Sequence, residues 1–248
     1  MKYLIIGDVH ADYTVFNNAV AYAHNNDLHL YSVGDLVDNG TEGPDVVSSM
    51  LELLHAGKAS MVRGNHEYKI QRWLDGCNVK ITPPNQITVD QMTADSQFKD
   101  NFVKMMQYAK PYDQLTDSIF IAHAALLPKF WNTAPDQMSK RDVELMMFGQ
   151  TDNSEICHYR GETYPVRIYD WVDHVPDGVT LFVGHDPRPF IGKPDFDHFQ
   201  IAPTSKMNVH GGTTVFLDCG AGKGGTLWGA VVDTDSKHVI ETMVNFSV

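Results

Sequence analysis

Ile5-Ile6-Gly7-Asp8-Val9-His10 joins a short apolar run to a glycine and then to two residues that can bind a metal ion. An unbroken apolar run is typical of a strand that is covered on both faces. The pattern recurs in three segments, Ser32-Val33-Gly34-Asp35-Leu36-Val37-Asp38, Met61-Val62-Arg63-Gly64-Asn65-His66-Glu67 and Phe182-Val183-Gly184-His185. A fifth segment, Ile121-Ala122-His123, also places a histidine after an apolar run. Because ligands bind beyond the carboxyl ends of strands in such sheets, we expect five strands to deliver polar groups to one edge.

The apolar residues between these segments predict a mixture of helices and strands. The expected helices span residues 12–24, a segment opened by Pro44 and Asp45 and closed near Gly57, and residues 95–110, 137–148 and 166–174. The expected strands span residues 3–6, 28–33, 59–62, 118–122, 179–183, 213–217, 227–232 and 238–244. Residues 75–90 are expected to form a loop, and glycines 220, 222, 224 and 225 indicate a hairpin. Together these elements predict two mixed sheets flanked by helices.

Length and composition favour one domain over residues 1–248, with a mainly helical and loop insertion at about 75–112. The chain is 43% hydrophobic and carries no internal repeat or linker. Its net charge of −12 disfavours nucleic acid as a partner, although bound divalent cations would reverse the local sign. The apolar run at the N-terminus is too short for a signal peptide, and no stretch reaches the ~20 apolar residues of a membrane span. Three scattered cysteines complete the expectation of a cytoplasmic protein with no membrane partner.

The donor groups predict a site for two divalent metal ions. Asp8 and His10 are two residues apart, so both reach one ion from a turn, and the two oxygens of Asp35 suit it to bridge a pair of ions. The second ion is completed by Asn65, His123 and His185. This mixture of donors suits manganese, iron or zinc, of which we expect Mn²⁺. Two-metal hydrolases hold their ions ~3.5–4 Å apart around the attacking and leaving oxygens.

The remaining polar residues near these strand ends predict the catalytic and phosphate-binding groups. His66 is placed to donate a proton to a leaving oxygen, and Asp38 to fix its tautomer and raise its pKa. The candidates for binding phosphate oxygens are Arg63, Arg160, Arg167 and Asn65. Arg63 equally suits a structural ion pair, whereas Glu67 is expected to support the site without joining it.

These motifs resemble those of the calcineurin-like metallophosphoesterases, and more narrowly the phosphoprotein phosphatase branch. They stand in order from residue 7 to about 225 as Gly7-Asp8-Val9-His10, Gly34-Asp35-Leu36-Val37-Asp38-Asn39-Gly40, Gly64-Asn65-His66-Glu67, His123 and Gly184-His185. The resemblance implies a four-layer αββα sandwich. It also implies a first ion on Asp8, His10 and Asp35, a second on Asp35, Asn65, His123 and His185, and a catalytic pair of His66 and Asp38.

The expected activity is hydrolysis of phosphate monoesters, as in the bacterial and phage serine/threonine phosphatases, on a phosphorylated protein or small phosphoester. Two alternatives stay open. One is a nucleotide or RNA-end phosphatase or phosphodiesterase, of the polynucleotide or dinucleoside polyphosphate type. The other is a metal-binding module without catalysis. The symmetrical diadenosine tetraphosphatases lack the residue matching Asp38, which disfavours that branch. Asn39 replaces the arginine by which the family binds phosphate, so the resemblance does not determine the substrate.

Overall fold

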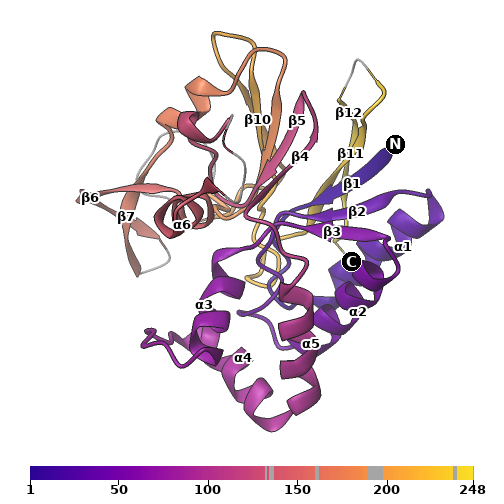
Figure 1. Cartoon of the computed structure of the whole chain (residues 1–248), viewed down its shortest axis with the longest axis vertical. Coiled ribbons are helices and arrows are strands. Elements are labelled where there is room, and N and C mark those ends of the chain that lie inside the picture. Colours follow the sequence, from indigo (N-terminus) through magenta and orange to yellow (C-terminus); the bar gives the residue numbers. More distant parts are fainter. Residues whose placement is uncertain (132, 134–136, 160–161, 189–197, 237–238, 248) are drawn as a thin grey trace.

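The computed structural model describes residues 1–131, 133, 137–159, 162–188, 198–236 and 239–247. Two five-stranded mixed sheets stand at its centre, with helices outside them (Figure 1). Three separate groups of buried apolar side chains fill the space between layers. One lies between the first sheet and its helices, one between the two sheets, and one outside the second sheet. The expected four-layer αββα sandwich is thereby confirmed.

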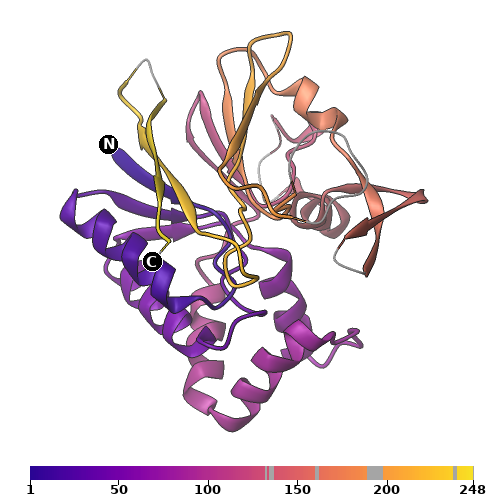
Figure 2. The ribbon, with the colours of Figure 1, turned by 180° about the vertical axis from the view of Figure 1, so that it is seen from behind.

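The first sheet has the strand order β12-β11-β1-β2-β3, in which β1, β2 and β3 are parallel. Its strands are β1 (Lys2–Ile6), β2 (His29–Ser32), β3 (Ala59–Met61), β11 (Trp228–Asp233) and β12 (Ile240–Asn245). Helices α1 (Tyr13–Asn25) and α2 (Gly43–His55) cover its outer face, as Figure 2 shows from behind. Asp12 caps α1 through the Val15 amide, and Pro44 lies in the first turn of α2.

The second sheet has the order β4-β5-β8-β10-β9. Its strands are β4 (Tyr112–Thr116), β5 (Ile119–Ala122), β8 (Thr180–Val183), β9 (Thr204–Met207) and β10 (Thr213–Phe216). Helix α6 (Lys140–Phe148) and the 3₁₀ turns η1 (Pro128–Phe130) and η3 (Asp170–His174) lie on its outer side. Because β5, β8 and β10 are parallel, the carboxyl ends of β5 and β8 lie at the same edge of this sheet.

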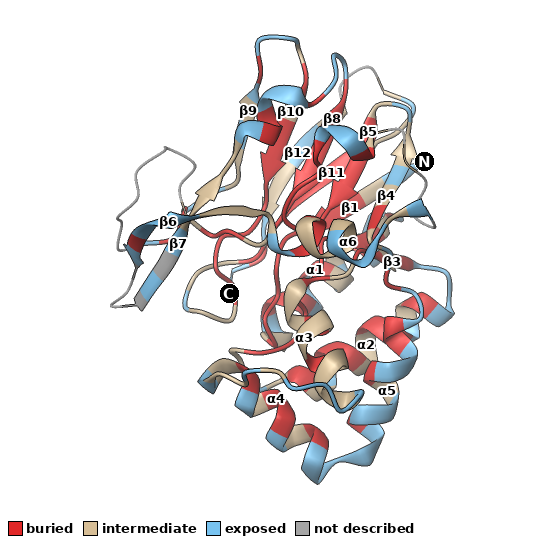
Figure 3. Cartoon of the chain, turned by 60° about the vertical axis from the view of Figure 1, so that its left-hand side comes forward, coloured by how far each residue is buried: buried red, intermediate tan, exposed pale blue. Residues whose placement is uncertain are grey.

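Two further groups of elements extend from the sandwich. Helices α3 (Asn65–Leu74), α4 (Pro83–Ala94) and α5 (Ser96–Met106) form the lower part of the molecule in Figure 3, where α4 and α5 turn buried residues inward and exposed residues outward. Strands β6 (Gln150–Tyr159) and β7 (Glu162–Ile168) form a two-stranded antiparallel hairpin at the side. The interpretation of residues 75–112 as an insertion stays a prediction.

Three predicted elements were wrong. Residues 75–90 are not loop throughout, because α4 begins at Pro83, whose ring suits a first helical turn. Residues 166–174 do not form one helix. Their first part pairs with β6 as a strand, since Thr151 lies opposite Arg167, and only the last five residues turn as η3. The glycine-rich segment is not a hairpin, because β10 and β11 belong to different sheets and the chain crosses between them.

Candidate metal centre

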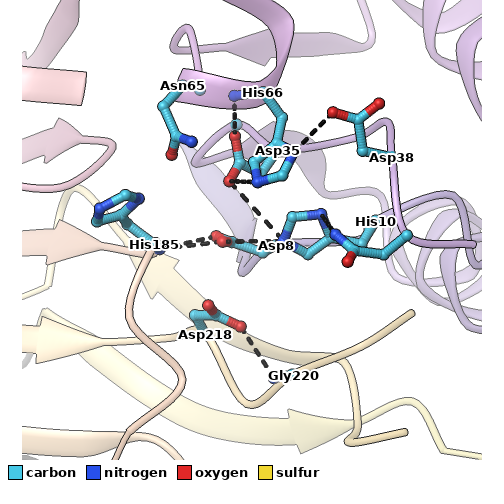
Figure 4. A network of polar contacts seen from close by, with 12 residues as sticks. Asp8, His10, Asp35, Asp38, Asn65, His66, His185, Asp218 and Gly220 are labelled. Atoms are coloured by element: carbon cyan, nitrogen blue, oxygen red, sulfur yellow. Dashed lines mark hydrogen bonds and ion pairs between the residues drawn. The ribbon is translucent and has the colours of Figure 1, made fainter. Parts of the chain in front are cut away.

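The loops that follow β1, β2, β3, β5 and β8 meet at one edge of the sandwich. All six residues predicted to bind metal come from these loops or, for Asn65, from the first residue of α3, and Figure 4 shows Asp8, His10, Asn65 and His185 around Asp35. Asp8, His10, Asp35 and His123 are fully buried. The structure therefore brings together the donor groups that the sequence pattern placed at strand ends, and their binding of ions stays a prediction.

Asp35 lies at the middle of this cluster. Its Oδ2 atom is 3.3 Å from Nε2 of His123, 3.8 Å from Nε2 of His10 and 3.9 Å from Nε2 of His66. Two sets of ligand atoms, each within 4.8 Å of one another, share this carboxylate: His10, Asp35 and His66, and Asp35, His123 and His185. A carboxylate common to two sets of donors is the arrangement that a bridged pair of ions requires.

Asp8 and Asn65 join the cluster from either side. Asp8 Oδ2 lies 3.7 Å from Nε2 of His10, and both of its oxygens accept the backbone N–H of His185, at 3.0 and 3.1 Å. Asn65 Oδ1 is 2.9 Å from Nε2 of His123. Each of the two thus lies beside a histidine of the ion to which it was assigned.

The imidazoles are oriented by backbone carbonyls. Nδ1 of His123 donates to Val33 O at 2.8 Å, and Nδ1 of His10 lies 3.2 Å from Val37 O. A proton on Nδ1 leaves the lone pair of Nε2 directed into the cluster, as metal-binding histidines require. Nε2 of His10 and of His185 is buried and has no hydrogen-bond partner among the described residues. These orphaned nitrogens, with carboxylates beside them, fit a pair of borderline divalent cations.

Two glycines are required by close approach. A Cβ on Gly184 would lie 2.1 Å from Asp8 Oδ1, and a Cβ on Gly64 would lie 2.2 Å from Asp35 Oδ1. Either contact would displace a carboxylate of the centre, which explains the glycine in the pattern of strand, glycine and donor.

The backbone of the centre is strained. Left-handed φ angles occur at His10, Asp35, Asp38, Asn39 and His185, between 50° and 73°. Such conformations cost energy in residues other than glycine and gather at functional sites, where the surrounding contacts hold them in place.

Glu67 supplies the contacts that hold the Asp35 loop. Its buried carboxylate accepts the backbone N–H groups of Leu36 at 2.7 Å, Asp35 at 2.8 Å, Gly64 at 3.1 Å and Val37 at 3.2 Å. Burial raises the pKa of Glu67 to about 7, and the nearby Asp35 adds to the shift. Glu67 therefore holds the backbone of the Asp35 loop through hydrogen bonds, the supporting position that the sequence suggested.

The electrostatic state of the centre follows from dense packing of acids and imidazoles. Burial, then the neighbouring carboxylates of Asp218 and Asp35, raises the pKa of Asp8 well above its usual value. Burial also acts to raise the pKa of Asp35, but the imidazoles of His123 and His66 outweigh it and lower that pKa strongly. Burial lowers the pKa of His10 and of His185, so both stay neutral and keep a lone pair for a cation.

His66 and Asp38 form the pair that was predicted. Nδ1 of His66 lies 2.7 Å from Oδ2 of Asp38. Burial acts to lower the pKa of His66, but the carboxylates of Asp35 and Asp38 outweigh it and raise the pKa above its usual value. The imidazole therefore carries a proton more readily, while its Nε2 atom faces the Asp35 side of the centre.

Two supporting residues of Asp38 were not predicted. The side-chain amide of Asn85 donates to Asp38 Oδ2 at 2.5 Å, and the backbone N–H of Asp38 donates to Thr88 Oγ1 at 3.2 Å. Both come from α4, which the sequence pattern assigned partly to a loop. No local motif marks them, because their role depends on how α4 packs.

Asp218 was also missed. It follows β10, is fully buried and accepts the backbone N–H of Gly220 at 2.9 Å (Figure 4). Its carboxyl group interacts electrostatically with that of Asp8, and burial raises its pKa. An apolar run over residues 213–217 followed by an acid matches the pattern at the other strand ends except for the glycine, so part of the signal was present.

The predicted phosphate-binding residues have different surroundings. The guanidinium of Arg167 forms an ion pair with Asp186 at 3.2 Å and donates to Phe148 O at 2.9 Å. Together with His185, Arg167 and Asp186 line a small pocket beside the centre. Arg63 is partly buried, and its Nε atom has no hydrogen-bond partner in the part of the chain that the structure describes. Arg160 lies outside the described residues.

Asn39 lies against His10, with its side-chain nitrogen 3.0 Å from His10 Nδ1. The residue that replaces the family arginine thus contacts a predicted ligand. On the other side of His10 lies the glycine-rich crossover, where a Cβ on Gly222 would come within 2.2 Å of the His10 carbonyl oxygen.

A four-layer sandwich with clustered carboxylates, imidazoles and an amide at one edge is the construction of a metal-dependent phosphoesterase. The chain belongs to the calcineurin-like phosphoesterase family, whose sequence model matches residues 1–213. It is thus a metal-dependent hydrolase of phosphoric esters, in a family that uses a dinuclear divalent metal site.

Several relatives of this chain share one name, that of an asymmetrical bis(5'-nucleosyl)-tetraphosphatase. The chain is 28% identical over 204 residues to the bis(5'-nucleosyl)-tetraphosphatase PrpE [asymmetrical] of Anoxybacillus flavithermus, which covers 75% of this chain and 79% of the relative. It is 26% identical over 249 residues to the protein of that name from Bacillus cereus (strain B4264), covering 92% of this chain and 89% of the relative.

Solved structures share the fold. A putative diadenosine tetraphosphatase superposes with a TM-score of 0.58 at 18% identity, over 98% of this chain and 93% of the other. A serine/threonine phosphatase from Saccharomyces cerevisiae superposes with a TM-score of 0.57 at 15% identity, over 100% of this chain and 80% of the other. Within the described ranges, no helix is both long and apolar enough to cross a membrane.

Proposed function

We propose that this protein hydrolyses dinucleoside polyphosphates at a dinuclear metal centre, by cutting the anhydride bond of an outer phosphate to release a mononucleotide. The observation that carries the proposal is the Asp35 carboxylate shared between two sets of donors. The substrate is supported by relatives that span most of the chain and are named asymmetrical tetraphosphatases. These relatives favour the nucleotide alternative over the serine/threonine phosphatase that the motifs first suggested.

The proposed ligands are Asp8, His10 and Asp35 for one ion, and Asp35 with Asn65, His123 and His185 for the other. Mn²⁺ is our first choice, with iron or zinc as alternatives. When bound, the ions supply positive charge to the phosphoryl oxygens and make a water molecule nucleophilic near neutral pH. The protein contributes orientation, because carbonyl groups fix the tautomers of His10 and His123.

His66 is the proposed proton donor to the leaving oxygen, and Asp38 is its positioning residue. A nucleoside triphosphate leaves as a weakly basic phosphate oxygen, whereas a serine leaves as a strongly basic alkoxide. The proton from His66 is therefore needed less for an anhydride than for an alkyl phosphate. Asn39 occupies the position at which the family has an arginine that binds a single phosphate group. A centre without this arginine suits a polyphosphate substrate.

The charges around the centre suit a polyanion despite the acidity of the whole chain. Arg63 interacts electrostatically with Glu67, and Arg167 with His185, and Arg167 lines the neighbouring pocket. We assign phosphate binding to these two residues, to Asn65 and to Arg160. A cytoplasmic location is part of the proposal, since soluble nucleotides are the substrates.

Analysis of the products tests the proposal. Incubation of the protein with diadenosine tetraphosphate and Mn²⁺ is expected to give equal amounts of AMP and ATP by ion-exchange chromatography. Asp35→Asn, which removes the charge of the shared carboxylate, serves as the control and is expected to lose turnover. Two molecules of ADP would contradict asymmetrical cleavage. Hydrolysis of a phosphoserine peptide without cleavage of the dinucleotide would restore the phosphoprotein alternative.

A further inference from the structure

An aromatic pair lies beside the metal centre and has no part in it. The rings of Tyr68 and Phe148 meet edge to face, with centroids 6.3 Å apart and an angle of 71° between their planes. Tyr68 belongs to α3 and Phe148 is the last residue of α6, so the pair joins two helices from distant parts of the sequence (Figure 3). Phe148 is 40% exposed, so solvent reaches this residue.

Three contacts place this pair close to the proposed ligands of the second ion. Tyr68 follows Asn65 by three residues on α3, so the two side chains lie on one side of that helix. The amides of Ala124 and Ala125, which directly follow His123, donate to Met146 O and hold the C-terminal end of α6. The pair therefore lies beside the ligands contributed by α3 and by the loop after β5.

Phe148 also adjoins the pocket beside His185. The next residue, Gly149, lines that pocket together with His185 and Arg167. The carbonyl oxygen of Phe148 accepts a hydrogen bond from Arg167 Nη1. The backbone of Phe148 thus faces the pocket while its ring meets Tyr68, so the aromatic pair continues the surface that leads away from the centre.

Guanidinium groups accompany the aromatic rings. The Arg72 guanidinium carbon lies 5.8 Å from the centroid of the Tyr68 ring. Arg63 interacts electrostatically with Tyr68, and in the described part of the chain the Nε atoms of both arginines are buried without a hydrogen-bond partner. Tyr68 itself is fixed by a hydrogen bond to Glu144 at 2.8 Å. Rigid aromatic rings bordered by cations are suited to a ligand that combines a flat ring with negative charge.

We infer that Tyr68 and Phe148 form the binding site for a nucleobase of the substrate, with Phe148 as the stacking surface and Arg63 and Arg72 facing the polyphosphate. The inference rests on the proposed function, because only a nucleotide substrate carries both a base and a chain of phosphates from the centre to this pair. Stacking on an aromatic ring tolerates any base, so the site selects nucleotides without selecting among purines.

Steady-state kinetics of the full chain with Mn²⁺ test the inference on two substrates, diadenosine tetraphosphate and inorganic tripolyphosphate, which carries phosphate anhydride bonds but no ring. Phe148→Leu keeps an apolar side chain on α6 and removes the aromatic face. It is expected to raise KM for the dinucleotide roughly 5- to 150-fold more than KM for tripolyphosphate, the range that corresponds to one stacked base. Phe148→Tyr retains a ring and is expected to behave as the unaltered protein.

Tyr108→Ala is the matched control, since Tyr108 is 41% exposed on a different part of the surface, where its ring meets His55. It is expected to change neither KM. Equal effects of Phe148→Leu on both substrates, or no effect on either, would overturn the inference. The proposed function would still stand in that case if the unaltered protein cleaved the dinucleotide. An unaltered protein that hydrolyses tripolyphosphate but not the dinucleotide would overturn both.

Discussion

Replacing Glu67 by glutamine is expected to destabilise the protein strongly, although Glu67 contacts no substrate. The carboxylate accepts four backbone N–H groups, two on each oxygen. Glutamine keeps one carbonyl oxygen, so its amide nitrogen would face two N–H donors that are buried and left unsatisfied. Each such donor costs about 1–3 kcal/mol, so the free energy of unfolding should fall by about 2–6 kcal/mol. That is a large part of the about 5–15 kcal/mol of a typical domain.

Chemical denaturation followed by circular dichroism measures this loss. It should be carried out at pH 8, above the pKa of about 7 that burial gives Glu67, so that the unaltered protein carries the carboxylate. Glu52→Gln is the matched control, because Glu52 is exposed on α2, and it should change the free energy by less than about 0.5 kcal/mol. A change below about 1 kcal/mol for Glu67→Gln would refute the assignment of Glu67 as the residue that holds the Asp35 loop.

Three further results are expected. Asp38→Asn removes a charge that raises the pKa of His66, so the pH above which kcat for diadenosine tetraphosphate declines should move downward; an unmoved pH profile would argue against His66 as the proton donor. Asn39→Arg should raise kcat/KM for p-nitrophenyl phosphate roughly tenfold if it restores a charged fork, and an unchanged rate would show that phosphate is gripped elsewhere. Chelation with EDTA should lower the Tm, because the charges of Asp8 and Asp35 lose their cations. Addition of Mn²⁺ at 100 times its Kd should restore about 2.7 kcal/mol; a Tm unaffected by either would count against a built metal site.

The donor cluster was predictable because each part of it is local in the sequence. An apolar strand followed by glycine and a donor can be read within a few residues, and parallel strands bring such ends to one edge. Asp8, Asp35 and His185 needed no further information. Asp218 also follows a strand, β10, but without the glycine of the pattern, and the glycines after it suggested a hairpin.

The support of the centre was not predictable in the same way. Asn85 and Thr88 reach Asp38 from α4, a helix whose position depends on its packing against other helices. The β6–β7 hairpin was missed because residues 166–174 contain apolar residues that fit a helical period, whereas pairing with β6 decided the structure of their first part. Tertiary contacts, more than local preference, determined these elements.

Anomalous X-ray scattering from a crystal grown with Mn²⁺ tests the central claim most directly. Two peaks about 3.5–4 Å apart should appear, with one oxygen or both oxygens of Asp35 within bonding distance of each ion. His10 should lie beside one peak, and His123 and His185 beside the other. A single peak, or two peaks of which one makes no contact with Asp35, would contradict the bridged pair of ions.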